Sequence, residues 1–322
     1  MTEPLLRRLH ARGERITVAA LPWVAPVYRV MPHVSATIEL PFAHGGLQWS
    51  ARRALAKTLR GQFERAVVCP NSWKSALVPW WAGIPQRVGY LGEARWGLLT
   101  QRLPNPKKHE RPPMVAFYAA LSGDAAVSHD RPMLVPDGAA DSAALLALGL
   151  ERQGYWVMAP GAEYGPAKRW PAEHFAALAR AIFQKTGQSV VLLGSNKDSA
   201  VCETIRRLAN ADAPNACRDL SGKTRLDQAF SVIGQARAMV SNDSGLMHIA
   251  AALGVPQVAL FGSSSPLHTP PLSDAAQTIW LKNAPHYLPP LDCAPCFARV
   301  CPLGHTRCLQ DITPAMVLER LF

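Results

Sequence analysis

The 322-residue chain carries a net charge of +11 and contains 48% hydrophobic and 18% charged residues, which is typical of a globular protein long enough for two domains. No run of about 18 apolar residues is present, which excludes a membrane-spanning helix, and the N-terminus lacks the pattern of a secretory signal peptide. We therefore expect a cytoplasmic protein, or one that contacts a membrane only at its surface.

The predicted elements alternate between strands and helices along the chain. In the first third, apolar runs predict strands at 16–21, 36–40, 65–70 and 87–90, with helices at 49–60 and 74–82. After a passage rich in Pro, Gly and Asp at 131–141, strands are predicted at 155–160, 189–194, 238–242 and 257–262, with helices at 172–186, 198–210 and 245–253. This alternation indicates an α/β protein with parallel sheets covered on both faces. We expect two Rossmann-like, doubly wound domains, 1–150 and 151–322, facing a cleft.

The beginning of the chain departs from this pattern. It opens with a helix-like segment at 3–12, whereas a doubly wound domain usually begins with a strand and a ligand-binding turn. Either the first domain starts with a helix, or one strand and its turn lie upstream of Met1.

The excess of positive charge is confined to the first third of the chain. Residues 1–115 contain 17 Lys and Arg against 6 Asp and Glu, and residues 116–322 contain 17 of each kind. This asymmetry suggests a first domain that faces an anionic partner, and a basic, solvated surface without a ligand is the alternative. A nucleic-acid partner is not expected, because no recognisable reading module accompanies the charge.

Polar segments directly after predicted strands are candidate ligand sites, because open sheets bind ligands beyond the carboxyl ends of their strands. In PGAEYGPAKRWP, residues 160–171, Gly161 permits close backbone approach, and Lys168 and Arg169 supply positive charge beside the start of a helix. Glu163 could pair with one of these cations or accept a hydrogen bond from a sugar hydroxyl. The segment is thus either a phosphate site or an exposed loop anchored by its Trp.

The segment SNDSGLMHIAAAL, residues 241–253, begins a helix with several polar residues. Asp243 or Ser244 can cap this helix through a side-chain oxygen, which leaves N–H groups of the first turn directed at a ligand. Capping does not account for His248, which projects from the same end of the helix as Gly245. We therefore predict that these four residues line a ligand site.

A third post-strand turn, LLGSNKD at 192–198, supplies Ser195 and Asp198. Asp198 either caps the following helix or contacts a nucleoside, and the sequence favours neither role. No G-x-G-x-x-G or P-loop pattern occurs, so the usual dinucleotide and triphosphate fingerprints are missing.

In the basic first domain, polar residues follow the strand at 65–70 and lead into a helix. The candidates for binding an anionic ligand there are Asn71, Ser72, Lys74, Arg87 and Arg95. Interleaved aromatic residues could face a carbohydrate ring or a membrane interface; they are Trp73, Trp80, Trp81 and Trp96. For Trp80 and Trp81 we favour a place in the core or at its rim.

Four of the seven cysteines lie close together near the C-terminus: Cys293, Cys296, Cys301 and Cys308. Their C-x2-C-x4-C-x6-C spacing, with His305 nearby, could bind zinc. The single C-x-x-C pair and the surrounding Pro and Gly residues favour reduced thiols or a local disulfide, so we expect no metal.

Taken together, PGAEYGPAKRWP, SNDSGLMHIAAALGVPQVALFGSSSP and the Thr-Pro-Pro at 269–271 resemble the ADP-heptose:lipopolysaccharide heptosyltransferases of glycosyltransferase family 9. PNSWKSALVPWWAGIPQRVGY narrows this resemblance to the heptosyltransferase II branch. The resemblance implies a GT-B architecture, with an acceptor held by the first domain and a sugar nucleotide by the second. It also implies transfer of L-glycero-D-manno-heptose from ADP-heptose to the heptosylated inner core of lipopolysaccharide in a Gram-negative cell, with inversion of the anomeric centre. The enzyme would contact the inner membrane at its cytoplasmic face.

The same resemblance implies specific residues. Lys168 resembles a diphosphate-binding lysine, and residues 243–248 match the D-[ST]-G-x-x-H donor pattern. The implied donor-binding set is Gly161, Ala162, Glu163, Lys168, Arg169, Ser195, Asp198, Asp243, Ser244, Gly245 and His248, and the implied acceptor-binding set is Asn71, Ser72, Lys74, Arg87 and Arg95. No cofactor or metal is required if protein cations stabilise the departing ADP.

One segment of the family pattern is not found. Family members open with a strand and a G-D loop whose aspartate resembles a general base, and Met1 aligns beyond that point. We expect that the true start lies upstream or that the segment was lost. In the second case, an impaired or non-catalytic homologue that binds anionic glycolipid or nucleotide sugar is the alternative function.

Overall fold

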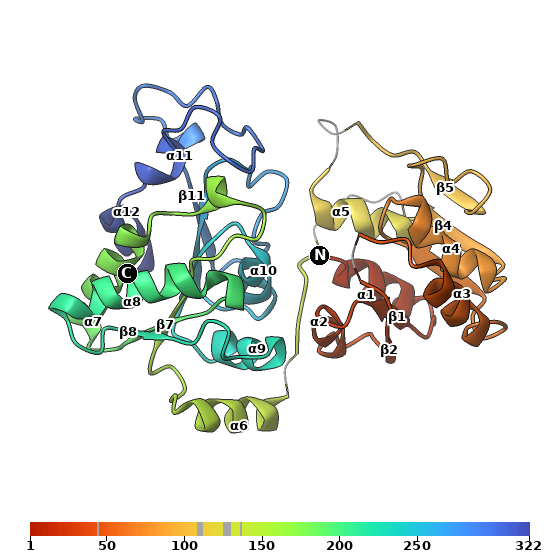
Figure 1. Cartoon of the computed structure of the whole chain (residues 1–322), viewed down its shortest axis with the longest axis horizontal. Helices are drawn as coiled ribbons and strands as arrows, with labels where there is room; N and C mark the ends of the chain where they lie inside the picture. Colours follow the sequence, from red (N-terminus) through yellow and green to blue (C-terminus); the bar gives the residue numbers. More distant parts are fainter. Residues whose placement is uncertain (44, 108–111, 125–129, 136) are drawn as a thin grey trace. The chain divides into compact units, whose positions relative to one another are not determined.

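The computed structural model describes residues 1–43, 45–107, 112–124, 130–135 and 137–322, which form two units, Met1–Pro132 and Met133–Phe322 (Figure 1). The division therefore lies between residues 132 and 133 and not at 150. It falls within the passage rich in Pro, Gly and Asp at 131–141, of which residue 136 lies outside the described residues. The boundary differs because α6 (Gly138–Leu148) packs against α9 (Leu226–Gly234). Asp141 of α6 is buried and accepts hydrogen bonds from Ser231 Oγ at 2.7 Å and Gln235 Nε2 at 3.0 Å.

The second unit is built on a six-stranded sheet in which every paired strand is parallel, in the order β11-β10-β9-β6-β7-β8. The strands are β6 (Trp156–Ala159), β7 (Val190–Leu192), β8 (Cys217–Asp219), β9 (Met239–Asn242), β10 (Gln257–Phe261) and β11 (Ala276–Trp280). The four predicted strands are all present. The two outer strands, β8 and β11, were missed because their sequences CRD and AQTIW mix polar and apolar residues, as edge strands do, and contain no uniform apolar run.

Helices cover both faces of this sheet. The helices of the second unit, besides α6 and α9, are α7 (Ala172–Thr186), α8 (Ser199–Asp212), α10 (Gly245–Ala252), α11 (Arg307–Gln310) and α12 (Pro314–Leu321), with short 3-10 turns η2 (Pro166–Lys168), η3 (Asn196–Asp198) and η4 (Leu281–Asn283). Trp156 and Met158, two residues apart on β6, belong to a core cluster with α7 and α8. Met247 of α10 packs with Ala259 and Phe261 of β10 in a separate cluster. Fully burying each large apolar side chain contributes about 1.5–3 kcal/mol to stability.

The first unit contains two smaller parallel sheets. One pairs β1 (Thr17–Ala20) with β2 (Ala36–Glu39), and the other has the order β3-β4-β5, with β3 (Arg65–Val68), β4 (Gln86–Tyr90) and β5 (Gln101–Leu103). The helices of this unit are α1 (Glu3–Ala11), α2 (Ala25–Arg29), α3 (Trp49–Thr58), α4 (Trp73–Trp81) and α5 (Met114–Ala119), followed by the turn η1 (Ala120–Ser122). The predicted strands and helices are found, and β5 is an additional short strand.

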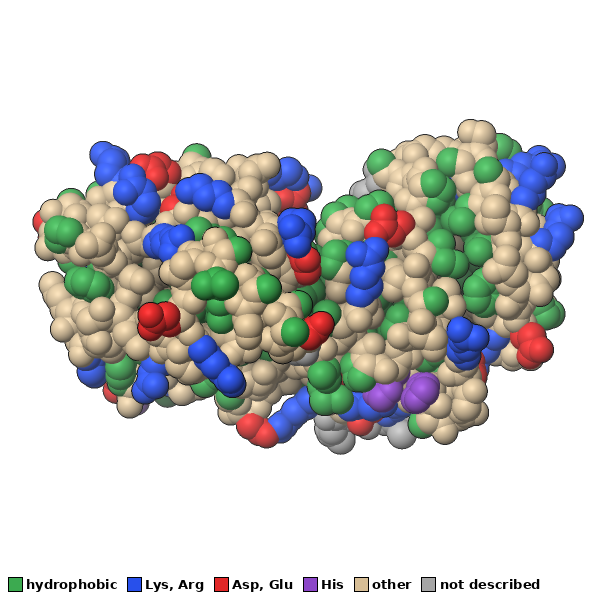
Figure 2. Space-filling view, turned by 90° about the horizontal axis from the view of Figure 1, so that it is seen from below, with side chains coloured by type: hydrophobic (Ala, Val, Ile, Leu, Met, Phe, Trp, Pro, Cys, Tyr) green, Lys and Arg blue, Asp and Glu red, His purple; other side chains and the backbone are tan. Residues whose placement is uncertain are grey.

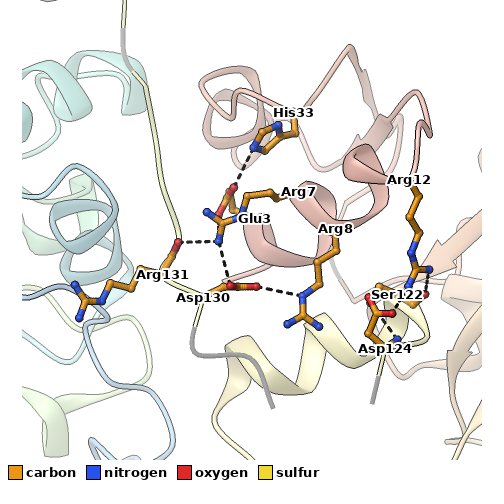
Figure 3. A network of polar contacts seen from close by, with 9 residues as sticks. All are labelled: Glu3, Arg7, Arg8, Arg12, His33, Ser122, Asp124, Asp130 and Arg131. Atoms are coloured by element: carbon orange, nitrogen blue, oxygen red, sulfur yellow. Dashed lines mark hydrogen bonds and ion pairs between the residues drawn. The ribbon is translucent and has the colours of Figure 1, made fainter. Parts of the chain in front are cut away.

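Helix α1 buries an apolar face together with Glu3 and carries its basic side chains toward the surface. Leu5, Leu6 and Leu9 are buried, and basic side chains of the helix contact the end of the first unit (Figure 3). Arg8 Nε lies 3.1 Å from Asp130 Oδ2, and Arg7 Nη2 donates to the Arg131 carbonyl at 3.2 Å. Arg12, just past the helix, donates to the Ser122 carbonyl and to the Asp124 carboxylate. Partly exposed ion pairs of this kind add little energy each, so the buried leucines provide most of the anchoring.

On the face shown in Figure 2, Lys and Arg side chains are spread out and do not gather in one patch. Among the described residues, no helix is long and apolar enough to cross a membrane.

Candidate functional site

The candidate site lies at the carboxyl ends of two neighbouring strands of the second unit, β6 and β9. The segment after β6 carries Lys168, and the residue directly after β9 is Asp243; Lys168 Nζ donates to Asp243 Oδ2 at 2.5 Å. The Asp243 side chain is 7% exposed and that of Lys168 is 18% exposed. Lys168 Nζ also lies 5.1 Å from the centroid of the Tyr164 ring. The structure thus joins the two motifs that sequence analysis singled out, as expected for parallel strands whose ends meet at one edge.

Asn242 fixes the segment that carries Lys168. Its side chain is fully buried, its Oδ1 accepts a hydrogen bond from Trp170 N at 3.0 Å, and its Nδ2 donates to the Pro160 carbonyl at 2.7 Å. The two bonds hold both ends of the segment between β6 and α7. Asn242 was not among the predicted site residues, although a buried amide at the carboxyl end of an inner strand is a signal of this role.

The polar residues at the start of α10 do not cap it through their side chains, which corrects the predicted capping role. Ser244 is the N-cap residue, but its Oγ makes no capping hydrogen bond and, among the described residues, is buried without a partner. Asp243 is engaged with Lys168 instead. The N–H groups of the first turn of α10, beginning at Gly245, are therefore not capped by a side chain, and the buried Ser244 hydroxyl has no hydrogen-bond partner among the described residues.

His248 lies on α10 one turn after Gly245 and is half-buried. Burial lowers the pKa of its imidazole, the neighbouring Asp243 carboxylate opposes this shift, and Lys168 adds to it. The imidazole is therefore neutral at pH 7 and can accept or donate one hydrogen bond at the site.

Other members of the predicted donor set take part in local structure. Glu163 pairs with the exposed Lys197 at 2.7 Å and not with Lys168 or Arg169; that hydrogen bond and the charge of Lys197 hold the pKa of Glu163 below its usual range. Asp198 Oδ2 accepts hydrogen bonds from Ser195 N at 2.9 Å and Ser195 Oγ at 2.8 Å. The Asp198 carboxylate thus belongs to the capping box of the turn η3, in which Ser195 is the N-cap, and it makes no capping hydrogen bond to the following helix α8.

Gly161 and Ala162 lie where the segments after β6 and β7 approach each other. A Cβ atom on Gly161 would come within 2.5 Å of the Asp198 carboxylate, so a side chain there has no room. Ala162 is buried. For Arg169, the Nε atom is buried without a hydrogen-bond partner in the described part of the chain.

Two serines after β10 were missed by sequence analysis. Ser263 and Ser264 are buried, and within the described ranges their Oγ atoms lack hydrogen-bond partners. They follow the uniformly apolar strand β10, which pairs with β9, so their place after a strand was the available signal.

In the first unit, the predicted acceptor residues divide into two kinds. Arg95 is fully buried and donates to the Pro70 and Tyr90 carbonyls, and Arg87 Nε donates to the Leu98 carbonyl at 2.7 Å. Both guanidinium groups bind the backbone of their own unit, and the fully buried Arg95 is not accessible to a ligand in this structure, whereas Arg87 is half-exposed.

The remaining three acceptor candidates lie at the carboxyl end of β3 and the start of α4. Ser72 Oγ shares a hydrogen bond with Ser75 Oγ at 2.6 Å, Lys74 Nζ donates to the Gly45 carbonyl at 2.5 Å, and Asn71 Oδ1 is buried without a partner among the described residues. Of these three residues, Asn71 is thus the one whose side chain has a buried polar atom without a hydrogen-bond partner among the described residues.

The four tryptophans singled out in the first unit differ in exposure. Trp73, Trp80 and Trp96 are exposed. Trp81 is half-buried: it packs against the cluster that contains Phe42 and Leu59, and its ring meets that of Trp49 edge-on at 4.6 Å. The preference for a place in the core or at its rim therefore fits Trp81, and Trp80 is exposed.

The four clustered cysteines line one cavity of the second unit, together with His305. All four are free thiols, and among the described residues no group of three or more possible ligands stands at metal-binding spacing. Burial by itself would raise the pKa of Cys301, but backbone N–H groups of residues 303–306 donate to its sulfur and together bring the pKa below its usual value. Burial, followed by the three neighbouring thiols, raises the pKa of Cys308 to about 11.

Cys301 should react with iodoacetamide at least about tenfold faster than Cys308 at pH 7.5, because the thiolate is the nucleophile and Cys301 forms it more readily. The rates can be measured by mass spectrometry of peptides after brief alkylation of the native protein. The fully buried Cys202 is the internal control and should remain unlabelled. Equal labelling of Cys301 and Cys308 would contradict the difference in pKa.

A doubly wound α/β fold with a cation and an open helix N-terminus at the carboxyl edge of its sheet is typical of proteins that bind the phosphates of a nucleotide, and the GT-B sugar-nucleotide enzymes are one class of these. The solved structure of E. coli ADP-heptose lps heptosyltransferase II supports this class, with a TM-score of 0.84 and 38% identity over 99% of this chain and 92% of that one. The chain belongs to glycosyltransferase family 9 (heptosyltransferase), whose sequence profile matches residues 52–306. It is therefore a glycosyltransferase.

Curated relatives agree with this assignment over nearly the whole length. Lipopolysaccharide heptosyltransferase 2 of Escherichia coli K12 is 42% identical, and the alignment covers 100% of this chain and 93% of that protein. Lipooligosaccharide heptosyltransferase 2 of Haemophilus influenzae is 40% identical over 95% of this chain and 89% of its own. The resemblance found in the sequence and the GT-B fold that it implied are confirmed.

Proposed function

We propose that this glycosyltransferase moves L-glycero-D-manno-heptose from ADP-heptose to the heptosylated inner core of lipopolysaccharide, with inversion of the anomeric carbon. The observation that carries the proposal is the half-buried Lys168, held by Asp243 beside the open N-terminus of α10. The names of the relatives supply the donor and the acceptor, because they are lipopolysaccharide and lipooligosaccharide heptosyltransferases. The protein would act at the cytoplasmic face of the inner membrane.

In this proposal the second unit holds the ADP part of the donor. As the bond between the heptose C1 and the phosphate oxygen breaks, the electron pair stays on the departing ADP, whose diphosphate gains negative charge. Lys168 and the N–H groups at the start of α10 stabilise this charge more strongly in the transition state than in the ground state. Asp243 keeps the Lys168 ammonium in place before the donor binds.

Further groups would complete the donor site. The Ser244 hydroxyl and the neutral His248 imidazole lie at the same end of α10 and can hydrogen-bond a phosphate or a sugar hydroxyl. The proposed donor-binding set also includes residues of the segment around Lys168: Gly161 and Ala162, which precede it, and Arg169, which directly follows it. Protein groups then supply the charge stabilisation for the departing ADP.

In the same proposal the first unit binds the acceptor, a phosphorylated glycolipid. Its residues 1–115 carry the whole excess of positive charge, which suits an anionic partner at a membrane surface. Asn71 and Lys74, after β3, are the proposed contacts. The acceptor hydroxyl attacks C1 from the face opposite the ADP and transfers its proton to a base, which gives inversion.

The proposed function is tested by measuring ADP release from ADP-heptose in the presence of a purified, heptosylated core acceptor. Release that depends on the acceptor, together with a mass increase of one heptose on the acceptor, is the expected result. Binding of ADP-heptose without acceptor-dependent release would favour the alternative, an impaired homologue that only binds the nucleotide sugar or glycolipid.

Gly245→Ala should weaken donor binding without destabilising the fold. Gly245 is the first residue of α10, no atom outside its own helix lies within 4 Å of a Cβ built there, and its φ lies outside the left-handed region. Alanine should therefore change the free energy of unfolding by less than about 1 kcal/mol. The added methyl group would lie where a phosphate approaches the first-turn N–H groups, so we expect KM for ADP-heptose to rise about tenfold.

The measurements for this variant are urea unfolding and initial rates of ADP release. A stability loss as large as the binding loss would show that the glycine serves the fold, and unchanged KM would contradict the close approach of the donor to α10.

A further inference from the structure

The segment that carries Lys168 is held at its two ends by one side chain. Asn242 bonds the backbone at Pro160 and at Trp170, and residues 161–169 between these points form the β6–α7 segment. Apart from the short 3-10 turn η2, these residues have no regular secondary structure. Irregular backbone is more mobile than a helix or a strand, so the position of the lysine depends on contacts that the middle of this segment makes.

The middle of the β6–α7 segment is bonded to residues 297–299, which lie among the four clustered cysteines. Tyr164 Oη donates to the Phe297 carbonyl at 2.6 Å, and Arg299 Nε donates to the Tyr164 carbonyl at 2.7 Å. The backbone adds a further bond, since Ala167 N donates to the Arg299 carbonyl at 3.1 Å. Three hydrogen bonds thus join two segments that are far apart in the sequence.

The two segments are also closely packed. A Cβ atom built on Gly165 would clash with the carbonyl oxygen of Arg299, so the two backbones approach with no room for a side chain. Ala167, the residue directly before Lys168, is buried and lines the same cavity as the four clustered cysteines. A displacement of residues 297–299 would therefore move the backbone next to Lys168.

Residues 297–299 are in turn anchored to the sheet. Phe297 N donates to the Ser263 carbonyl at 2.7 Å, and Ser263 lies in the loop after β10. β10 pairs with β9, and Asp243, the partner of Lys168, directly follows β9. The segment after β6 is therefore tied to the end of β10, on the other side of the strand that carries the carboxylate partner.

Two cations lie near the Tyr164 ring. The Lys168 Nζ atom is 5.1 Å from the ring centroid, and the Arg299 Cζ atom is 5.5 Å from it. Both distances are within the range of a cation–π attraction. Arg299 is exposed, so its removal should disturb the β6–α7 segment without opening the core of the unit.

We propose that Arg299 is a positioning residue that holds Lys168 in place, through Tyr164 and the backbone at Ala167, for the departing diphosphate. The inference rests on the proposed function, because the charge that Lys168 stabilises there is that of ADP. Both the Nε and the carbonyl group of Arg299 bond to the β6–α7 segment. Such contacts matter because a displacement of about 1 Å at a reacting group can lower a rate by about 10²-fold.

The first test is the kinetics of Arg299→Ala. We expect kcat for acceptor-dependent ADP release to fall about tenfold and KM for ADP-heptose to stay within about twofold, because a displaced Lys168 loses its effect mainly in the transition state. Arg299→Lys should restore part of the activity, since it keeps a cation near the Tyr164 ring. The matched control is Arg218→Ala on β8, because Arg218 is also exposed and donates to a backbone carbonyl, that of Gly149, at 3.3 Å.

A double-mutant cycle separates positioning from direct contact with the donor. In a protein that already carries Lys168→Ala, adding Arg299→Ala should change kcat by less than about twofold, because no lysine is left to position. If the two losses multiply instead, Arg299 acts on the donor independently of Lys168 and the proposal is overturned. Equal kcat for Arg299→Ala and the Arg218→Ala control would overturn it as well.

Hydrogen exchange gives a readout that needs neither donor nor acceptor. In Arg299→Ala, the amides of a peptide that spans residues 162–169 should exchange at least about tenfold faster than in the parent, with the amides of β6 and β9 unchanged. Unchanged exchange in this peptide would overturn the proposal. A parent protein that shows no heptose transfer would refute the proposed function, and the exchange data would still decide whether Arg299 holds the segment.

Discussion

Lys168→Ala should lower kcat/KM for ADP-heptose by about 10²–10³-fold while the protein remains folded, because in the proposed function it removes the cation that stabilises the departing diphosphate. The loss is enlarged by Asp243, whose side chain is 7% exposed and would lose its partner at 2.5 Å. An unpaired carboxylate at this position repels ADP as its negative charge grows. Initial rates of ADP release over a range of donor concentrations measure the effect, and far-UV circular dichroism confirms the fold.

Lys197→Ala is the matched control for this variant. Lys197 belongs to the same unit and is also paired with a carboxylate, Glu163, at 2.7 Å, but both side chains are more than 70% exposed. We expect its kcat/KM to stay within about twofold of the parent, since an exposed pair adds little. In Lys168→Ala combined with Asp243→Asn, part of the lost activity should return, because the unpaired charge is removed. Near-normal turnover by Lys168→Ala alone would refute its role at the diphosphate.

Asn242→Ala should lower the free energy of unfolding by about 2–4 kcal/mol. Asn242 is fully buried and satisfies Trp170 N and the Pro160 carbonyl, so alanine leaves two buried backbone groups without partners. The same change frees both ends of the segment that carries Lys168, so donor turnover should fall as well. Urea unfolding followed by circular dichroism gives the stability.

Asn210→Ala is the matched control, which tests whether the burial of Asn242 is the reason for the large loss of unfolding free energy. Asn210 also makes two backbone hydrogen bonds, accepting from Cys217 N at 2.8 Å and donating to the Cys217 carbonyl at 2.9 Å, but it is only half-buried. Water can replace these bonds, so we expect a loss of about 1 kcal/mol or less. If Asn242→Ala cost no more than Asn210→Ala, the segment after β6 would be held by other contacts.

Much of the fold could be predicted because its inner strands have a simple sequence signature. YWVMAP, SVVLLG, AMVSN and QVALFG are uniformly apolar, since strands in a sheet covered on both faces bury both sets of side chains. The short edge strands and helices such as α6 lack such a signature, because exposure on one side admits polar residues. The units divide between residues 132 and 133, whereas the prediction placed the boundary at 150. The difference arises because the packing of α6 on α9 involves the buried Asp141, which no local pattern distinguishes from a surface acid.

The candidate site could be located from sequence but not resolved into partners. Residues after parallel strands meet at one edge, so the proximity of Lys168 and Asp243 followed from the order of the strands. The partner of each polar side chain depends on differences in position of about an ångström, which the sequence pattern does not specify. For this reason two expectations were wrong: Glu163 pairs with Lys197 and not with Lys168 or Arg169, and the side chain of Ser244 does not cap α10. Arg95 resembled a ligand residue because buried arginines that bind backbone carbonyls are rare.

The pairing of Lys168 with Asp243 leaves these two residues of the proposed donor site without net charge, and residues 116–322 contain equal numbers of acidic and basic residues. The second unit therefore contributes little long-range attraction for a diphosphate, because the excess of positive charge lies in residues 1–115. Association of a diphosphate with the second unit should depend less on ionic strength than association of a polyanion with the basic first unit. Discrimination between nucleotide sugars and other polyanions then rests on short-range fit at the strand ends.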